Sequence, residues 1–220
     1  MKTFVIGDIH GCLNTLKSLL ELIKINFNED KLIFLGDYID RGKWPIDTVL
    51  HIKKLVETYP NNVIALKGNH EDMCIRYMKY IDKIWSYNGF EKSINDLREL
   101  DEDVKNELLH WIENLPERYN DGYFKYCHSG YWENDLDGYG LKCTLWDRNW
   151  LRYNTNIKVQ PTIFGHTPLK DVTEVYPEMY DIDTGCVYGN KLTCVIVENS
   201  KIVDTISVEQ DEKDCLKSFL

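Results

Sequence analysis

The sequence has 220 residues, of which 43% are hydrophobic, enough for one well-buried core, so a single domain over residues 1–220 is expected. Its formal net charge of −10 argues against a nucleic-acid polymer as an obligate partner, because backbone binding depends on clustered Lys and Arg. No apolar run approaches the roughly 20 residues of a membrane span. The seven cysteines lack a CxxC pair and favour reduced thiols, so a cytoplasmic protein is expected.

Residues 1–70 alternate between predicted strands and predicted helices. Short apolar runs predict strands at residues 2–7, 31–36 and 62–68. Apolar residues recur at helical spacing from Leu13 to Ile23, and Pro45 fits the first position of a second helix. Strands joined by helices in this way predict parallel pairing with helical crossovers.

Residues 71–115 predict a helical insertion, because Met73, Tyr77, Met78 and Ile81 fall on one face of a helix. From residue 122 onward the pattern changes to strands, at 123–130, 161–168, 179–185, 191–199 and 201–209. The residues from Asp211 onward are polar and are expected to be loosely held. The predicted fold class is α/β, with two facing β-sheets flanked by helices and the helical insertion beside the site.

Five of the predicted strands end in a short turn that carries Asp, Asn or His. These residues are Asp8, His10, Asp37, Asn69, His70, His128 and His166. In four of the five turns a glycine comes first, which lets the backbone approach an ion or a phosphate closely. Side chains at the strand ends of α/β sheets meet in one crevice, and oxygen and imidazole ligands suit manganese, iron or zinc. The pattern therefore predicts a metal-dependent phosphoesterase.

Six motifs carry a resemblance to a known family. GDIHG, GDYIDRG and GNHE occupy residues 7–11, 36–42 and 68–71, and HSG, WDR and FGHTP follow at 128–130, 146–148 and 164–168. In this order they resemble the phosphoprotein phosphatase family of calcineurin-like metallophosphoesterases, above all the lambda-phage type bacterial serine/threonine protein phosphatases. The resemblance extends over nearly the whole chain and implies the calcineurin-like metallophosphoesterase sandwich.

The resemblance also implies two divalent metal ions, with Mn²⁺ as the first expectation and iron or zinc as alternatives. The implied ligands are Asp8, His10 and Asp37 for one ion, and Asp37, Asn69, His128 and His166 for the other. A carboxylate such as Asp37 can bridge two ions because it presents one oxygen to each. Two ions roughly 3.5–4 Å apart can generate hydroxide from water at neutral pH and polarise the phosphoryl oxygens.

Four further residues receive roles from the resemblance. His70 would donate a proton to the leaving oxygen, and Asp40 would orient its imidazole and raise its pKa. Arg41 and Arg148 would grip the phosphate, because a planar guanidinium can hold two oxygens at once. For Arg148 the alternative is a surface ion pair with Asp147.

The sequence favours one substrate class and leaves others open. The main expectation is a phosphomonoesterase for phosphoserine and phosphothreonine of proteins, with phosphotyrosine as an extension. The alternatives are a symmetrical bis(5'-nucleosyl)-tetraphosphatase, also called diadenosine tetraphosphate hydrolase, and a broad phosphodiesterase. A metal-free scaffold is disfavoured, because all six ligand positions and His70 are present.

Features between the motifs bear on this choice. A tetraphosphate would favour base-stacking aromatics, and Tyr87, Phe90, Tyr131 and Trp132 are available. The same segments carry acids that suit four phosphates poorly, namely Asp96, Glu99, Asp101, Glu102 and Asp103. The protein phosphatase is favoured on this ground. The expected partner is a phosphorylated protein or a small phosphoester, with no obligate nucleic acid, no membrane and no obvious regulatory subunit.

Overall fold

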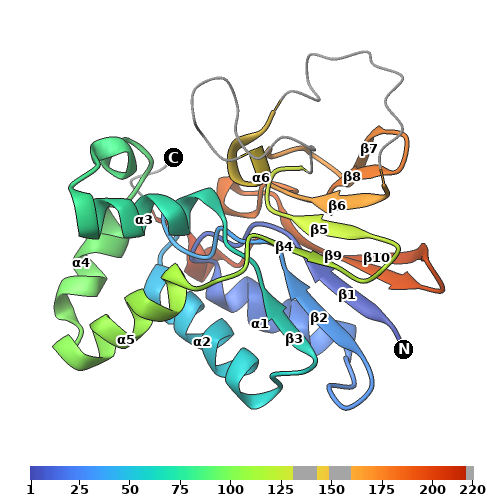
Figure 1. Cartoon of the computed structure of the whole chain (residues 1–220), viewed down its shortest axis with the longest axis horizontal. Helices are drawn as coiled ribbons and strands as arrows, with labels where there is room; N and C mark the ends of the chain where they lie inside the picture. The colour runs from blue at the N-terminus through green and yellow to red at the C-terminus, as the bar shows by residue number, and fades with distance from the viewer. Residues whose placement is uncertain (131–142, 149–159, 217–220) are drawn as a thin grey trace.

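The structure is a computed structural model that describes residues 1–130, 143–148 and 160–216. Two five-stranded sheets face each other with helices outside, which confirms the predicted fold class (Figure 1). The first sheet has the order β10 (Lys201–Glu209), β9 (Lys191–Glu198), β1 (Thr3–Ile6), β2 (Lys31–Phe34) and β3 (Val63–Ala65). The second has the order β4 (Arg118–Asn120), β5 (Lys125–Cys127), β6 (Thr162–Phe164), β8 (Met179–Asp181) and β7 (Thr173–Tyr176).

Strands β1, β2 and β3 are parallel, as their helical connections predict. Thr3 of β1 lies opposite Lys31 of β2, and Leu32 of β2 lies opposite Val63 of β3. The crossovers are α1 (Leu13–Ile23) and α2, which runs from Pro45 to Thr58 with the proline in its first turn. On the other side of β1 the sheet continues with β9 and β10, both in antiparallel pairing.

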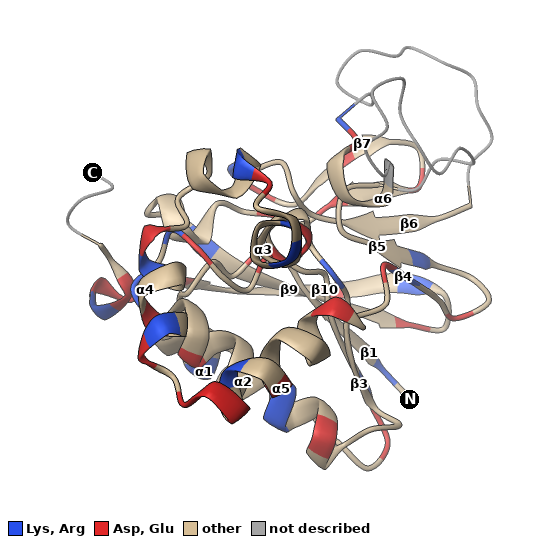
Figure 2. Ribbon diagram, turned by 60° about the vertical axis from the view of Figure 1, so that its left-hand side comes forward, with Lys and Arg blue, Asp and Glu red and all other residues tan. Residues whose placement is uncertain are grey.

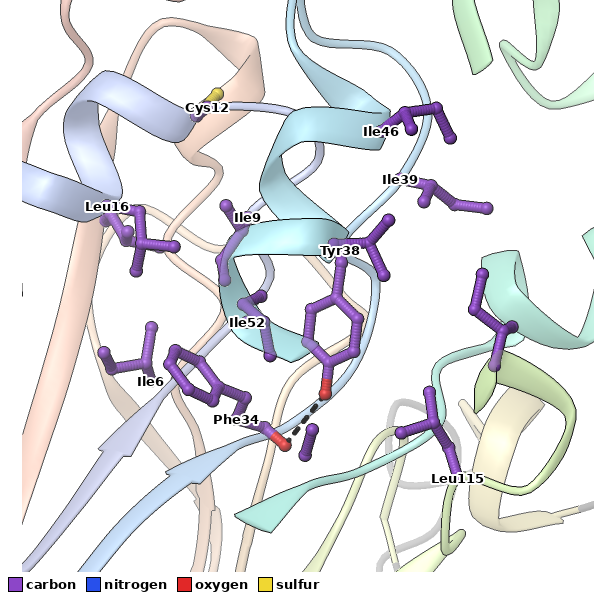
Figure 3. Packing of buried hydrophobic residues seen from close by; sticks show 14 of the residues in the cluster. Ile6, Ile9, Cys12, Leu16, Phe34, Tyr38, Ile39, Ile46, Ile52 and Leu115 are labelled. Atoms are coloured by element: carbon purple, nitrogen blue, oxygen red, sulfur yellow. Dashed lines mark hydrogen bonds between the residues drawn. The ribbon is translucent and has the colours of Figure 1, made fainter. Parts of the chain in front are cut away.

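Alternate residues of the first sheet pack into two different hydrophobic cores. Ile6 and Phe34 point to the side of α1 and α2, where Figure 3 shows them near Leu16 and Ile52. Val5, by contrast, packs into the core between the two sheets. Each fully buried aliphatic or aromatic side chain contributes about 1.5–3 kcal/mol to stability. Because successive residues of β1 and β2 point to opposite faces of the sheet and both faces are covered, the two strands are continuous apolar runs in the sequence.

The predicted insertion is helical throughout. It contains α3 (Asn69–Tyr80), the 3₁₀ helix η1 (Lys83–Tyr87), α4 (Glu91–Glu99) and α5 (Glu102–Glu113). Trp85 is fully buried at its centre, with the rings of Tyr77 and Phe90 at centroid distances of 5.6 and 5.4 Å. None of the helices in the described ranges combines the length and apolar character needed to cross a membrane.

The edge strands of the second sheet, β4 and β7, are not apparent in the sequence. Each has an antiparallel neighbour on one side only, and both are partly exposed, so neither shows a strong apolar pattern. The strand predicted over 179–185 is shorter than expected. It ends as β8 at Asp181, and the residues after it form a turn at the end of the sheet.

The C-terminal segment is firmly held, which contradicts the prediction that it is loose. A short 3₁₀ helix, η4 (Glu212–Asp214), places the Asp214 carboxylate at the N-terminus of α1, where it is completely buried. Its oxygens accept bonds from the backbone N–H groups of Asn14 and Thr15 at 3.1 and 2.8 Å and from both side chains at 2.7 Å. The carboxylate therefore caps a helix that lies about 200 residues earlier in the chain.

Replacing Asp214 with alanine should lower the free energy of unfolding by roughly 3 kcal/mol, because buried charged hydrogen bonds and a favourable helix-terminus charge are lost together. Glu212→Ala is the matched control, since Glu212 is exposed on the same turn. Urea titrations of the two variants and the parent measure the difference. Equal stability of all three proteins would show that the cap is energetically unimportant.

Candidate metal-dependent active site

The predicted site residues meet where five strands end. Asp8 and His10 follow β1, Asp37 follows β2, and Asn69 and His70 begin α3 after β3. His128 follows β5 and His166 follows β6, so both sheets contribute. The side chains that the sequence places at the site are all buried, each residue being at most 5% exposed: Asp8, His10, Asp37, Asn69, His70, His128 and His166.

Two of the glycines in these turns are required by close approach of the ligand-type carboxylates. A Cβ atom on Gly68 would lie 2.1 Å from Asp37 Oδ1, and one on Gly165 would lie 2.3 Å from Asp8 Oδ1. Neither distance is possible for real atoms. Glycine at these positions is therefore what allows the carboxylates to turn inward against the backbone of the neighbouring strand end.

The first group of donors surrounds Asn69 Oδ1. His128 Nε2 lies 2.8 Å and His166 Nδ1 3.0 Å from this oxygen, and the two ring nitrogens are 3.1 Å apart. Asp37 Oδ1 is 3.4 Å from His128 Nε2. Because Nδ1 of His128 faces the Leu35 carbonyl at 3.1 Å, a neutral ring would present the lone pair of Nε2 to these oxygens. The arrangement thus calls for a positive charge, from a second ring proton or from a cation.

The pKa of His128 also shows that this position favours a positive charge. Burial opposes charge on the ring, but the Asp37 carboxylate and its hydrogen bond outweigh burial and raise the pKa of His128. His166 behaves in the opposite way: burial and the neighbouring His128 hold its pKa well below the usual range. Its Nε2 is buried and has no hydrogen-bond partner among the described residues.

The second group of buried side chains consists of His10, Asp37 and His70, of which His10 and Asp37 are the predicted metal ligands. Asp37 Oδ2 is 3.3 Å from His10 Nε2 and 3.9 Å from His70 Nε2. Asp37 thus belongs to both groups, as a bridging ligand must. Asp8 accepts the backbone N–H of His166 with its two oxygens at 3.1 and 3.2 Å.

Carboxylates, imidazoles and one amide oxygen fit two divalent cations. Two buried carboxylates that sequence reasoning missed lie close enough to Asp8 to raise its pKa. Asp183 follows β8, and burial raises its pKa to about 6. Burial and Asp183 together raise the pKa of Asp8 well above its usual range. Asp181 is also buried, and its Oδ2 has no hydrogen-bond partner in the described part of the chain. The signal was present, because MYDIDTG is a sixth strand end that delivers Asp.

Glu71, the last residue of GNHE, is a third residue whose role the sequence did not suggest. Its completely buried carboxylate accepts the N–H groups of Asp37, Tyr38 and Gly68 at 2.8, 2.9 and 2.9 Å. It therefore ties the turn after β2 to the turn before α3. The position of the shared ligand Asp37 depends on this bond pattern.

The Asp40–His70 pair has the predicted geometry, but not the predicted pKa. His70 Nδ1 lies 2.5 Å from Asp40 Oδ2, and both residues are buried. Burial lowers the pKa of His70 to about 3, although the Asp37 carboxylate opposes this, and burial raises the pKa of Asp40. The expectation that Asp40 raises the pKa of His70 above its ordinary value is therefore wrong: removal from water outweighs the carboxylate partner and disfavours charge on both groups.

Both predicted phosphate-binding arginines lie at the site. Arg41 Nη1 donates to His10 Nε2 at 2.6 Å, and burial together with this guanidinium holds the pKa of His10 well below its usual range. Arg148 is exposed, and its Nη2 donates to the carbonyl of His166 at 3.3 Å. Two guanidinium groups thus border the cluster of ligand-type side chains.

Replacing Arg148 with alanine should leave metal binding intact and raise KM for a phosphate ester roughly tenfold, because one charged hydrogen bond to the phosphate is lost. Arg118→Ala, an exposed arginine on β4, is the control. Steady-state kinetics with p-nitrophenyl phosphate and metal analysis measure both quantities. Parent-like KM in the Arg148 variant would exclude its role in phosphate binding.

The chain is similar in sequence to several known proteins. The sequence model of the family described as calcineurin-like phosphoesterase matches residues 1–205. The asymmetrical bis(5'-nucleosyl)-tetraphosphatase PrpE of Bacillus subtilis (strain 168) is 27% identical, over 86% of this chain and 88% of its own. The symmetrical bis(5'-nucleosyl)-tetraphosphatase of Pasteurella multocida is 24% identical, over 91% and 95%. Serine/threonine-protein phosphatase 1 of Salmonella typhimurium is 28% identical, over 89% and 91%.

Solved structures share the fold. A protein serine/threonine phosphatase from Saccharomyces cerevisiae aligns with a TM-score of 0.66 and 18% identity, over 96% of this chain and 80% of its own. A metallophosphoesterase from Sphaerobacter thermophilus aligns with a TM-score of 0.60 and 21% identity, over 96% and 90%. At such identities these likenesses concern the fold alone.

Proposed function

This chain belongs to the calcineurin-like phosphoesterase family, and from that premise we propose that it hydrolyses bis(5'-nucleosyl) tetraphosphates with two divalent cations. The observation that carries the hydrolytic part is the shared position of Asp37 between two groups of buried ligand-type side chains. Two bound cations would activate a water molecule and polarise the phosphoryl oxygens. We propose Mn²⁺ for both, with iron or zinc as alternatives.

The protein's own residues would bind and orient the substrate. Arg41 and Arg148 would hold the oxygens of the phosphate that is attacked, each with its planar guanidinium. His70 would face the leaving oxygen with Nε2 while Asp40 holds Nδ1 at 2.5 Å. Asp37, fixed by Glu71 through its backbone N–H, would keep the two ligand groups in register.

The relatives support a dinucleoside polyphosphate as substrate more strongly than the main sequence expectation, a phosphoprotein. Asymmetrical and symmetrical bis(5'-nucleosyl)-tetraphosphatases both match this chain along most of its length. Two of the five acids that weighed against four phosphates have local basic partners: Asp96 pairs with Lys92, and Glu102 pairs with Lys105. Figure 2 shows acidic and basic residues together on α4 and α5, so these helices do not present a purely acidic surface.

Tyr188 offers a place for a nucleobase. It ends the 3₁₀ helix η3 (Cys186–Tyr188), is 52% exposed, and its ring centroid lies 5.7 Å from Arg41 Cζ. Partial burial raises the pKa of Tyr188, and so do Asp183, Asp37 and Asp8, which places the ring near the site carboxylates. An open aromatic face beside a phosphate-binding arginine suits a nucleotide, whose base can stack while its phosphates bind the guanidinium. Two of the aromatics weighed for this role, Tyr131 and Trp132, lie outside the described residues.

The test compares kcat/KM for diadenosine tetraphosphate and a phosphoserine peptide with added Mn²⁺. We expect the tetraphosphate to be the better substrate. Replacing Tyr188 with leucine should raise the KM for diadenosine tetraphosphate about tenfold, which is the effect of losing one base stack. Tyr188→Phe is the control, because it keeps the ring. Turnover of p-nitrophenyl phosphate, which has no base, should not change in either variant.

The second candidate is a serine/threonine protein phosphatase, favoured by the Salmonella typhimurium relative, which is 28% identical over 89% of this chain. A higher kcat/KM for the phosphopeptide would support it and would contradict the tetraphosphatase. In either case we propose a substrate bound without a nucleic-acid polymer, membrane or regulatory subunit. The described cysteine thiols are free, which supports our further proposal of a reducing, cytoplasmic location.

A further inference from the structure

Two consecutive residues at the site have an unusual backbone. Asp40 has a φ of 71° and Arg41 a φ of 63°, in the left-handed region that residues with a Cβ atom rarely adopt. Such a turn persists only where its surroundings fix it. Asp40 contacts the imidazole of His70, and Arg41 is one of the two arginines at the site, so whatever fixes this turn also sets the position of both.

The helical insertion provides these contacts. Ser93 Oγ, on α4, accepts the N–H of Asp40 at 2.9 Å and donates to Asp40 Oδ1 at 2.5 Å. The carbonyl of Gly89, between η1 and α4, accepts the N–H of Arg41 at 3.1 Å. Trp85 Nε1, on η1, donates to Asp40 Oδ2 at 2.6 Å. Every one of these groups comes from within residues 85–93.

The contacts are shielded from water. Asp40, Trp85 and Ser93 are each 0% exposed, so a donor lost from this cluster is not simply replaced by solvent. Oδ2 of Asp40 receives both the indole of Trp85 and the imidazole of His70, and Oδ1 receives the hydroxyl of Ser93. With both oxygens occupied from fixed directions, the carboxylate has one orientation, and the ring of His70 takes its direction from it.

We propose that Trp85 and Ser93 are positioning residues for proton transfer, holding Asp40 and through it the imidazole of His70 in line with the leaving oxygen. The inference rests on the proposed phosphoester hydrolysis, in which a proton released by the attacking water passes through His70 Nε2 to the leaving oxygen as the bond from that oxygen to phosphorus breaks, while the ring keeps its own proton on Nδ1, which faces Asp40. It gives the helical insertion a function in the reaction, in addition to covering the core.

The test uses two esters that differ in their need for a proton. Phenyl phosphate has a poor leaving group, and p-nitrophenyl phosphate has a good one. Ser93→Ala and Trp85→Phe should each lower kcat for phenyl phosphate about tenfold, the order expected for a misaligned acid, with KM and metal content unchanged. The loss on p-nitrophenyl phosphate should be no more than about twofold. Ser93→Thr keeps the hydroxyl and should therefore retain most of the parent kcat for phenyl phosphate.

Two matched controls lie in the same insertion. The hydroxyl of Ser86, on η1, donates to the Lys83 carbonyl, and Trp111 is half-buried on α5. Ser86→Ala and Trp111→Phe should leave the ratio of the two rates unchanged. Equal losses on both esters in the Ser93 and Trp85 variants, or the same ratio change in the controls, would overturn the positioning role.

A second measurement does not depend on activity. The His70 Nδ1 proton should give a low-field proton NMR resonance that disappears in His70→Asn, and Ser93→Ala should broaden or shift it. An unchanged resonance in Ser93→Ala would overturn the inference even if the metal-loaded parent hydrolysed neither ester. That lack of turnover would itself contradict the proposed function, so the two failures are distinguishable.

Discussion

Replacing Asp37 with asparagine should remove binding of both cations and nearly all activity. Asp37 is the one side chain common to the two groups of ligand-type residues, with Oδ2 3.3 Å from His10 Nε2 and Oδ1 3.4 Å from His128 Nε2. Asparagine keeps the shape but has no charge and only one oxygen. Loss of several kcal/mol of charge stabilisation corresponds to a fall in kcat/KM of about 10³-fold or more.

Metal analysis and thermal unfolding give readouts that do not require turnover. Added Mn²⁺ should raise the melting temperature of the parent, because a ligand that binds only the folded state stabilises it, and should have little effect on the Asp37 variant. Asp204→Asn, at an exposed position on β10, should respond to the metal like the parent. If the Asp37 variant retained two equivalents of metal, the bridging role would be wrong.

His70→Asn should produce the second largest effect, and on one class of substrate only. A positioned acid contributes about 10²–10⁴-fold, so kcat for phenyl phosphate should fall by that factor while both cations stay bound. The nitrophenolate ion leaves without a proton, so p-nitrophenyl phosphate should lose much less. His51→Asn, at a half-buried position on α2, is the control and should resemble the parent.

The same assay can test whether His70 and Ser93 act as one unit. Ser93 contacts Asp40, and Asp40 contacts His70, so Ser93→Ala should not lower kcat for phenyl phosphate any further once His70 has been replaced. Additive losses in the double variant would show two independent effects. If His70→Asn slowed both esters equally with the metals retained, His70 would be orienting water or substrate, and proton donation would be excluded.

The central features of this fold can be predicted from the sequence because local patterns of residues determine them. The strand ends before Asp8 and Asp37 are short apolar runs closed by glycine, and the structure shows why: both faces of β1 and β2 are buried, and the two glycines, Gly7 and Gly36, lie against the backbone of neighbouring strand ends. Residue types alone then indicate metal ligands. The convergence of these ligands follows from parallel strands ending at one edge, which helical crossovers make predictable.

What the sequence did not predict depends on partners far away in the chain. The Asp214 cap joins residues about 200 positions apart, and its segment has the polar composition of a free tail. Trp85 and Ser93 meet Asp40 across 45 and 53 positions, and neither occupies a motif. The pKa of His70 is a third case, since it is decided by burial, which a sequence pattern does not quantify.

The central place of β1 in the first sheet has a consequence during synthesis. Thr3–Ile6 leaves the ribosome before both of its neighbours in the sheet, and β2 can pair with it early, but its other neighbour, β9, begins only at Lys191. Until then the nascent chain presents an unpaired, apolar strand edge, the kind of edge that joins other chains. Such distant pairing also makes folding slow. A product truncated before Lys191 should therefore aggregate, and a chaperone that shields residues 3–6 should raise the yield of the full chain.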